Sequence, residues 1–535
     1  MSDSNNFDLS SLSFGSTGDY SQLLQNLTEQ LSSAQNSSEP QEQSQVQSQP
    51  REQPQSQALH PSSSEGNNTA GLPSTITLET DITFEQCAAM FNKYSHAKGE
   101  HCDEVIMGPF ECSMGVMQGQ RFLTVSIQHY APYSANKYTL CNKAFQIGEY
   151  HGKCKIGELP VQPVLDFEYE AGQLITRGTQ FIEVTKKPTY LHAYGFMYVP
   201  VWGGRMKRYV LDGRVVVDPE GYQKYSDADR WYNREVLDHV PDDMVSCTLP
   251  TVPVYSLDYR LWGEVPISHL GEITFDETAF NRTVLPENYR ENISVLVKNF
   301  YNTKCTDFIG GKKRGLVCLL NGPPGTGKTL TAQGIAELTH RPLFCIGSGD
   351  LGTKPDKIDK SLSQIFSMVQ NWGGIVLIDE ADVFMSTRTD YDVEYNACVS
   401  VFLRLVETYF GILFLTTNRD HNIDPAFDSR IHIRAHYDKL DQKGRALVWK
   451  ESLERYNIND MDYAKLAESD LNNREITNVI QLAYIKAGGI PSEVNLEVIS
   501  DFIEMRQKFT SMAKTSSSAK ATSIANATQS TIQLD

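Results

Sequence analysis

The sequence predicts an α/β core with a small helical lid, preceded by a mixed β-rich domain and a polar tail. Three observations predict it: a glycine loop between an apolar run and a helical segment, further short apolar runs that end in polar residues, and amphipathic segments after about residue 440. The expected boundaries are 1–75 for the tail, 78–282 for the β-rich domain, 283–313 for a linker, 314–437 for the α/β core, 438–510 for the lid and 511–535 for a second tail.

The first 75 residues are rich in Ser, Gln and Asn and poor in large apolar side chains. Such a segment cannot bury enough apolar surface to offset its chain entropy, so we expect disorder there and in the Ser/Thr/Ala-rich segment 511–535. One stretch differs, because five apolar side chains would share a helical face: Tyr20, Leu23, Leu24, Leu27 and Leu31. We favour a fleeting helix there, and a helix that docks on a partner groove is the alternative.

Between 78 and 282 the pattern changes to short β-like runs, for example 181–185, 191–201 and 208–218, with Gly203 and Gly204 as a hairpin turn. Aromatic side chains recur along these runs: Tyr190, Tyr194, Phe196, Tyr198, Trp202 and Tyr209. Aromatic residues that alternate along strands fit a packed core, which we favour, or the lining of a recognition groove.

The histidines of this domain raise the question of a metal. His192 is expected as an ordinary strand residue. His96, His101 and Cys102 are of metal-ligating types, but no matching second pair follows them in the chain, so we do not predict a site from them.

A phosphate-binding loop opens the predicted core. Residues 322–329 read GPPGTGKT, between an apolar run typical of a buried strand and a segment that suits a helix. Its glycines let backbone N–H groups point at phosphate oxygens, while Lys328 reaches the β- and γ-phosphates and the Thr329 hydroxyl is placed to ligate Mg²⁺. The residues expected to hold ATP are Gly322, Pro323, Pro324, Gly325, Thr326, Gly327, Lys328, Thr329 and Leu330, together with Asp379.

Two carboxylates follow a second predicted strand of the core. The apolar run 375–378 ends in Asp379 and Glu380. The carboxyl ends of parallel strands meet at one edge of a sheet, where α/β folds bind their ligands. We therefore expect Asp379 to hold Mg²⁺, directly or through water, and Glu380 to accept the proton of the water that attacks the γ-phosphate.

A third strand, 411–415, leads to Asn418, which is expected to polarise the attacking water. Arg430 follows in the segment DPAFDSR, where Asp428 is the one acid next to it in the sequence. We favour an arginine finger that reaches the γ-phosphate of a neighbouring subunit. A surface pair between Asp428 and Arg430 is the alternative.

Together these motifs resemble the AAA ATPases, within the larger AAA+ group of P-loop NTPases. In the terms of that family, GPPGTGKT is Walker A, IVLIDEAD is Walker B, LTTN is sensor 1 and DPAFDSR carries the arginine finger. The resemblance implies that Arg474 is a sensor 2 arginine that faces the γ-phosphate from the lid, and an exposed helix arginine is the alternative. It also implies a ring, typically of six subunits, that hydrolyses ATP and remodels protein partners.

The signatures ADVF, SVFLRLVE, GILFLTTNR and SRIH resemble in particular a group of largely uncharacterised, fungal-type AAA proteins. That group carries a domain of unknown function ahead of the ATPase, with patterns similar to 213–218 and 257–290. The resemblance covers about 160–490.

Two departures limit what the resemblance implies. AAA unfoldases usually place an aromatic-apolar-Gly triplet in the loop after the second strand, whereas 348–357 reads SGDLGTKPDK. An ATP-dependent assembly switch or scaffold without substrate threading therefore stands as the alternative to a remodeller. In addition, Arg430 stands alone where many AAA proteins have two arginines three positions apart.

Composition narrows the class further. A formal net charge of −18 argues against broad nucleic-acid binding, and the basic cluster 312–314 is expected to be a solvated segment that leads to the first core strand.

The ten cysteines include no C-x-x-C pair, so we expect neither structural zinc nor a disulfide framework, and we favour a reducing compartment. Apolar runs are too short to span a bilayer and no signal pattern opens the chain, so we expect an intracellular protein, cytoplasmic or nuclear. The run TNRD at 417–420 does not match the N-K-x-D guanine reader, which makes ATP the expected nucleotide.

Overall fold

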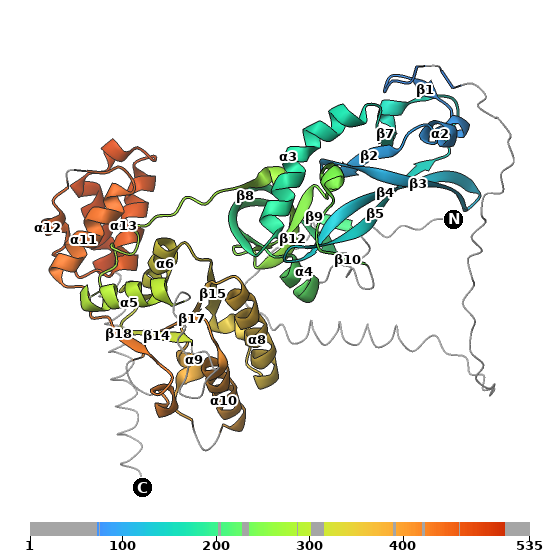
Figure 1. The fold of residues 1–535 in the computed structure, drawn as a ribbon. Helices are drawn as coiled ribbons and strands as arrows, with labels where there is room; N and C mark the ends of the chain where they lie inside the picture. Colours follow the sequence, from blue (N-terminus) through green and yellow to red (C-terminus); the bar gives the residue numbers. More distant parts are fainter. Residues whose placement is uncertain are drawn as a thin grey trace, which may run out of the picture. The chain divides into compact units, whose positions relative to one another are not determined.

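The structure is a computed structural model that describes residues 72–73, 75–201, 205–226, 235–285, 287–300, 315–388, 392–419, 423–459 and 461–508. The polar tail with its candidate helix, the segment 511–535 and the basic cluster 312–314 lie outside these residues. The described residues fall in one unit, Thr69–Asp535. Figure 1 shows them in colours that run from blue at β1 to red in the last helices.

A six-stranded sheet forms the first part of the β-rich region, with antiparallel strands in the order β10-β5-β4-β3-β2-β7. These strands are β2 His96–His101, β3 Glu104–Met117, β4 Gln120–Ser134, β5 Lys137–Gly148, β7 Val161–Pro163 and β10 Val236–Leu237. Burial alternates along β4, where Leu123, Val125 and Ile127 face a core that also holds Phe84 and Phe91 of α2 Phe84–Phe91. A small pair, β1 Asp81–Ile82 with β6 Cys154–Lys155, adjoins the same core.

A second, five-stranded sheet has the order β12-β11-β9-β8-β13. Its strands are β8 Thr189–Val201, β9 Arg205–Val217, β11 Thr251–Ser256, β12 Leu261–Pro266 and β13 Leu270–Gly271. The long strands β8 and β9 pair from Thr189↔Val217 to Val201↔Arg205, as a hairpin requires, although the turn residues 202–204 are outside the described part of the chain. The short elements of the region are α4 Pro219–Tyr225, η1 Ile156–Glu158, η2 Asp242–Cys247 and η3 Ile267–His269.

The β-like run predicted at 181–185 is wrong. These residues form the last turns of α3 Phe167–Thr185, which Asp166 caps by accepting a hydrogen bond from the Tyr169 amide. A segment this short fits a helix as well as a strand, and here the helix buries Phe181 against the second sheet.

The aromatic residues of β8 divide between core and surface. Tyr198 is buried, whereas Tyr194 and Phe196 are exposed. His192 lies on β8 as predicted and pairs with Asp212 of β9.

The α/β core is a parallel sheet in the order β15-β16-β17-β14-β18. Its strands are β14 Leu316–Asn321, β15 Leu343–Gly347, β16 Ile375–Asp379, β17 Ile412–Thr417 and β18 Ile433–His436. Both faces are covered, which explains the unbroken apolar runs. Alternate residues face α8 Pro355–Asn371 and α10 Val393–Thr408 on one side, and α5 Glu287–Asn299 and α6 Lys328–Thr339 on the other. Shorter elements connect them: α7 Ser348–Leu351, α9 Asp382–Met385 and η4 Pro425–Phe427.

The helix α5 lies where helical character is predicted within the linker 283–313, around 288–301, and it is part of the core packing. Its Ile293 and Val297 are fully buried against Leu316 and Leu320 of β14. Apolar residues four apart on a helix share one face, so this face has a structural role rather than a connecting one.

Three helices form most of the lid: α11 Gln442–Glu454, α12 Tyr463–Leu466 and α13 Asn473–Lys486. They lie, in that order, within the three segments that the sequence periodicity predicts to be helical, 441–456, 463–468 and 473–487. Residues 496–508 are also helical, after the short turn η5 Pro491–Glu493. The lid has its own core around the fully buried Trp449. Among the described residues, no helix is both long and apolar enough to cross a membrane.

Candidate active site

A cavity of about 420 Å³ lies at the carboxyl edge of the parallel sheet. Residues of the glycine loop, of the ends of β16 and β17, and of the lid line this cavity. The lining residues that the sequence singles out are Pro324, Gly325, Gly327, Lys328, Thr329, Leu330, Asp379, Glu380, Asn418 and Arg474. Gly322, Pro323 and Thr326 belong to the same loop without lining the cavity, and Arg430 lies elsewhere.

The glycine loop needs its glycines for both conformation and space. Gly322, Gly325 and Gly327 all have positive φ, a region that residues with a side chain rarely adopt. At Gly322 a Cβ atom would lie 2.2 Å from the Tyr437 carbonyl oxygen. At Gly325 it would lie 2.5 Å from Oδ1 of Asn472, so the lid also approaches the loop closely.

Replacing Gly322 with alanine is expected to destabilise the protein by about 1–3 kcal/mol, because the new Cβ combines a strained φ with a backbone clash. Thermal unfolding, followed by circular dichroism, measures this loss. Gly349→Ala is the matched control, since Gly349 lies in α7 with no heavy atom within 4 Å of an added Cβ. Equal melting temperatures for the two variants would contradict the argument.

Lys328 begins α6 and points into the loop. Its Nζ donates hydrogen bonds to the carbonyl oxygens of Gly322 and Pro323, both at 2.7 Å, and to Oδ1 of Asn418 at 3.0 Å. The ammonium group therefore lies between the loop expected to face the phosphates and the side chain expected to polarise water. The N-terminus of α6 adds the positive end of its dipole at the same place.

Asp379 lies beside the Thr329 hydroxyl, which donates to its two carboxylate oxygens at 3.2 and 3.3 Å. Hydroxyl and carboxylate oxygens are the ligands that Mg²⁺ prefers. The donor set at this position therefore fits the magnesium ion that accompanies ATP.

Glu380 follows with φ +55, a left-handed conformation that is costly for a residue with a side chain. Its backbone amide donates to Oγ1 of Thr416 at 3.0 Å, and the same hydroxyl donates to Asp379. Thr416 thus holds both acids in position. Sequence reasoning did not assign Thr416 a role, although its place at the end of β17 beside Asn418 was a signal for one.

Arg430 has a partner that the sequence did not reveal. Its Nη2 lies 2.6 Å from Oε2 of Glu407 on α10, and its Nη1 donates to the Ala426 carbonyl. The predicted alternative, a pair with Asp428, is wrong, because Asp428 pairs with Arg434. The sequence shows only Asp428 next to Arg430, because 23 positions separate Glu407 from Arg430 and the fold brings the two together.

The lid contributes Arg474 to the cavity lining, from the first turn of α13. The N-terminus of α13 is joined to the loop, because the Asn473 amide donates to the Gly325 carbonyl at 3.0 Å. Arg455, just after α11, also lines the cavity. The sequence did not reveal it, because a single arginine after a helix belongs to no recognisable motif.

Comparison with known proteins agrees with this site. Residues 318–439 match the family model "ATPase family associated with various cellular activities (AAA)". The chain is 29% identical over 167 residues to proteasome-activating nucleotidase 1 of Haloferax volcanii, covering 28% of this chain and 40% of that protein. It is 28% identical to a spastin homolog of Caenorhabditis elegans, covering 26% and 30%.

Vacuolar protein sorting-associated protein 4 of Dictyostelium discoideum is 29% identical over 178 residues, covering 30% of this chain and 38% of the relative. The chain thus spans less than half the length of each of these relatives. The glycine loop, the two acids and the lid are joined around one cavity, and the matched segment 318–439 is an AAA ATPase domain.

Proposed function

We propose that this chain hydrolyses ATP within a ring of identical subunits and uses the energy to remodel a protein partner. The observation that carries the proposal is the convergence of Lys328, Glu380 and Asn418 on one cavity. These side chains supply a cation for the phosphates, a base and a polar group for the attacking water.

In this proposal the loop amides and Lys328 bind the β- and γ-phosphates, and Thr329 with Asp379 would hold Mg²⁺, which neutralises phosphate charge when bound. Asn418 orients the water, and Glu380 takes its proton as the oxygen attacks the γ-phosphorus. The bond from that phosphorus to the β–γ bridging oxygen breaks, which leaves ADP and inorganic phosphate. Arg474 contacts the γ-phosphate from the lid.

A neighbouring subunit completes the site. Arg430 does not line the cavity of its own chain, so any contact that it makes with a γ-phosphate belongs to the next protomer. Head-to-tail contacts of this kind close into rings when the rotation between subunits permits. A hexamer is the number that the family resemblance implies.

A second candidate is an ATP-dependent assembly switch that does not thread its partner. The segment after β15 favours this candidate, because its own contacts fix it in place and do not leave it free to grip a partner polypeptide. Asp350 accepts from the Gly347 amide at 2.9 Å and pairs with Arg260 of the β-rich region, while Leu351 is fully buried. The sequence 348–357 also lacks an aromatic side chain to grip a polypeptide.

We also propose an intracellular place of action, in the cytoplasm or nucleus. The nine cysteines among the described residues are all free thiols, as a reducing compartment permits. The net charge of −18 disfavours nucleic acid as the partner.

Glu380→Gln tests the proposed function. The amide keeps the shape of the side chain but cannot accept the proton, so turnover should fall by about 10²- to 10⁴-fold while ATP binding is retained. Phosphate release and binding of a fluorescent ATP analogue measure the two properties. Glu394→Gln, an exposed change in the first turn of α10, is the control and should behave as wild type. Wild-type turnover in Glu380→Gln would remove the role given to Glu380.

The same variant separates the two candidates. Held in ATP, Glu380→Gln should retain the partner in a pull-down, and the partner is then mixed with wild-type protein and ATP. Loss of the partner's folded state supports a remodeller, whereas ATP-dependent assembly that leaves the partner folded supports the switch.

A further inference from the structure

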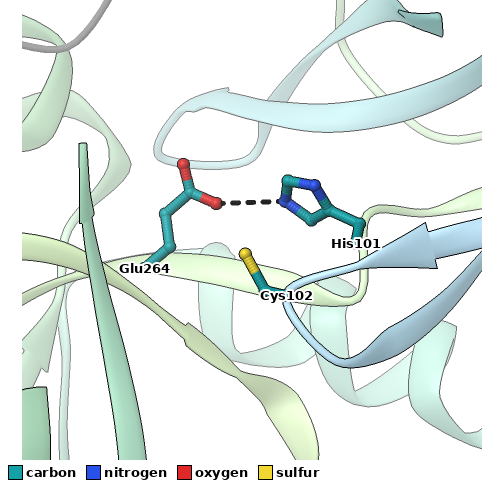
Figure 2. Close-up of side chains that lie close together, drawn as sticks. All are labelled: His101, Cys102 and Glu264. Carbon is teal, nitrogen blue, oxygen red and sulfur yellow. Dashed lines mark hydrogen bonds and ion pairs between the residues drawn. The ribbon is translucent and has the colours of Figure 1, made fainter. Parts of the chain in front are cut away.

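Two adjacent side chains of metal-ligating types meet a third, from a distant part of the sequence, in the β-rich region. His101 and Cys102 lie at the turn between β2 and β3, and Glu264 lies on β12 (Figure 2). One ligand atom from each lies within 4.8 Å of the other two. We propose that His101, Cys102 and Glu264 bind a divalent transition-metal ion of the zinc type.

The separations fit one ion. Tetrahedral zinc with bonds of about 2.0–2.3 Å places neighbouring ligand atoms roughly 3.3–3.8 Å apart. Nε2 of His101 lies 3.4 Å from Oε2 of Glu264, within that interval. The remaining separations do not exceed 4.8 Å.

The donor set selects the class of metal. An imidazole nitrogen, a sulfur and a carboxylate oxygen suit zinc, whereas magnesium and calcium prefer oxygen alone. Three protein ligands leave a fourth position for water. Glu264 is too far away in the sequence for ligand spacing to reveal it. His96 is not one of the three ligands, and its ring packs at a tilt against Phe167.

The carboxylate is already oriented by its neighbours. Glu264 is 9% exposed, and it accepts hydrogen bonds from Oγ1 of Thr251 at 2.8 Å and from the Tyr222 hydroxyl at 3.4 Å. Hydrogen bonds of this kind fix the direction of a metal ligand and raise metal affinity.

The turn that carries the other two ligands is held in place as well. Cys102 and Asp103 both have positive φ, at 52 and 64 degrees, which is unusual for residues with side chains. Asp103 accepts from the Tyr198 hydroxyl at 2.5 Å and from Arg208 at 3.2 Å, and these bonds anchor the turn to β8 and β9.

A bound metal ion would join the β2–β3 turn of the six-stranded sheet to β12 of the five-stranded sheet. Binding would therefore stabilise the folded β-rich region.

Zinc titration of the full-length protein, stripped with a chelator, tests the site. We expect one zinc ion per chain to be lost in both His101→Ala and Cys102→Ser, and zinc to raise the melting temperature of the wild type but not of these variants. Thr251→Val should retain the ion with about 10- to 100-fold weaker affinity. Cys112→Ser, on β3 outside the cluster, is the control and should bind as wild type.

Cobalt provides a readout of the ligands themselves. Co²⁺ bound to the wild type should give a thiolate-to-metal charge-transfer absorption that Cys102→Ser loses. A cooperative thermal unfolding transition, followed by circular dichroism, serves as the check that each variant is folded. A wild type that takes up no zinc, or folded His101→Ala and Cys102→Ser variants that bind it like the wild type, would overturn the proposal. Neither result depends on the proposed ATPase function.

Discussion

Replacing Arg430 with alanine is expected to lower ATP hydrolysis by about 10³- to 10⁵-fold while each subunit still binds ATP. The guanidinium would stabilise charge that develops on the γ-phosphoryl group in the transition state, so its loss affects the rate rather than ground-state binding. In the single chain Arg430 forms an ion pair with Glu407. Because this pair is near the surface, breaking it so that Arg430 can contact a phosphate costs little free energy. Phosphate release at saturating ATP gives the rate. Arg434→Ala is the control, since Arg434 is a nearby arginine whose partner is Asp428.

Mixing variants tests delivery from a neighbour. A subunit with Arg430→Ala has an intact cavity but supplies no arginine, whereas one with Lys328→Ala supplies the arginine but cannot hold ATP. Mixed rings should therefore regain activity that neither variant has alone. If Arg430→Ala hydrolyses ATP at the wild-type rate, the assignment fails, and if mixing restores nothing, the arginine does not act between subunits.

Replacing Lys328 with alanine is expected to abolish ATP binding and, with it, hydrolysis. The ammonium group opposes the negative charge of the phosphates, and without it Asp379 and Glu380 still line the same cavity and repel them. The loop also loses the hydrogen bonds from Nζ to two of its own carbonyl groups. Isothermal titration with ATP and Mg²⁺ measures the loss.

Lys360→Ala, an exposed change on α8, is the matched control and should bind ATP normally. Melting temperatures separate a binding defect from unfolding, because Lys328→Ala should remain folded. Retained wild-type affinity in Lys328→Ala would place the nucleotide elsewhere.

The sequence predicted the parts of the fold that local chemistry determines. The parallel strands follow from apolar runs such as 375–378, because a strand buried on both faces needs no alternation. The glycine loop was predictable because it matches a motif whose residue spacing is set by the geometry of a bound phosphate. Two lid helices are also marked locally: Asp441 caps α11 and Asn472 caps α13.

What the sequence did not reveal depends on contacts between distant segments. Glu407 meets Arg430 only because α10 ends beside the turn after η4. Glu264 reaches His101 across two sheets, and 163 positions separate the two residues. The segment 181–185 was misassigned because a run of five residues carries too little periodicity to separate helix from strand.

In the proposed reaction cycle, the hydrogen bond from the Asn473 amide to the Gly325 carbonyl would couple opening of the lid to loosening of the glycine loop. When α13 moves away, the loop would lose this restraint at the step in which ADP leaves. Discharge of ADP and resetting of the empty subunit would then share one barrier, and a change at either end of that bond should alter both rates together.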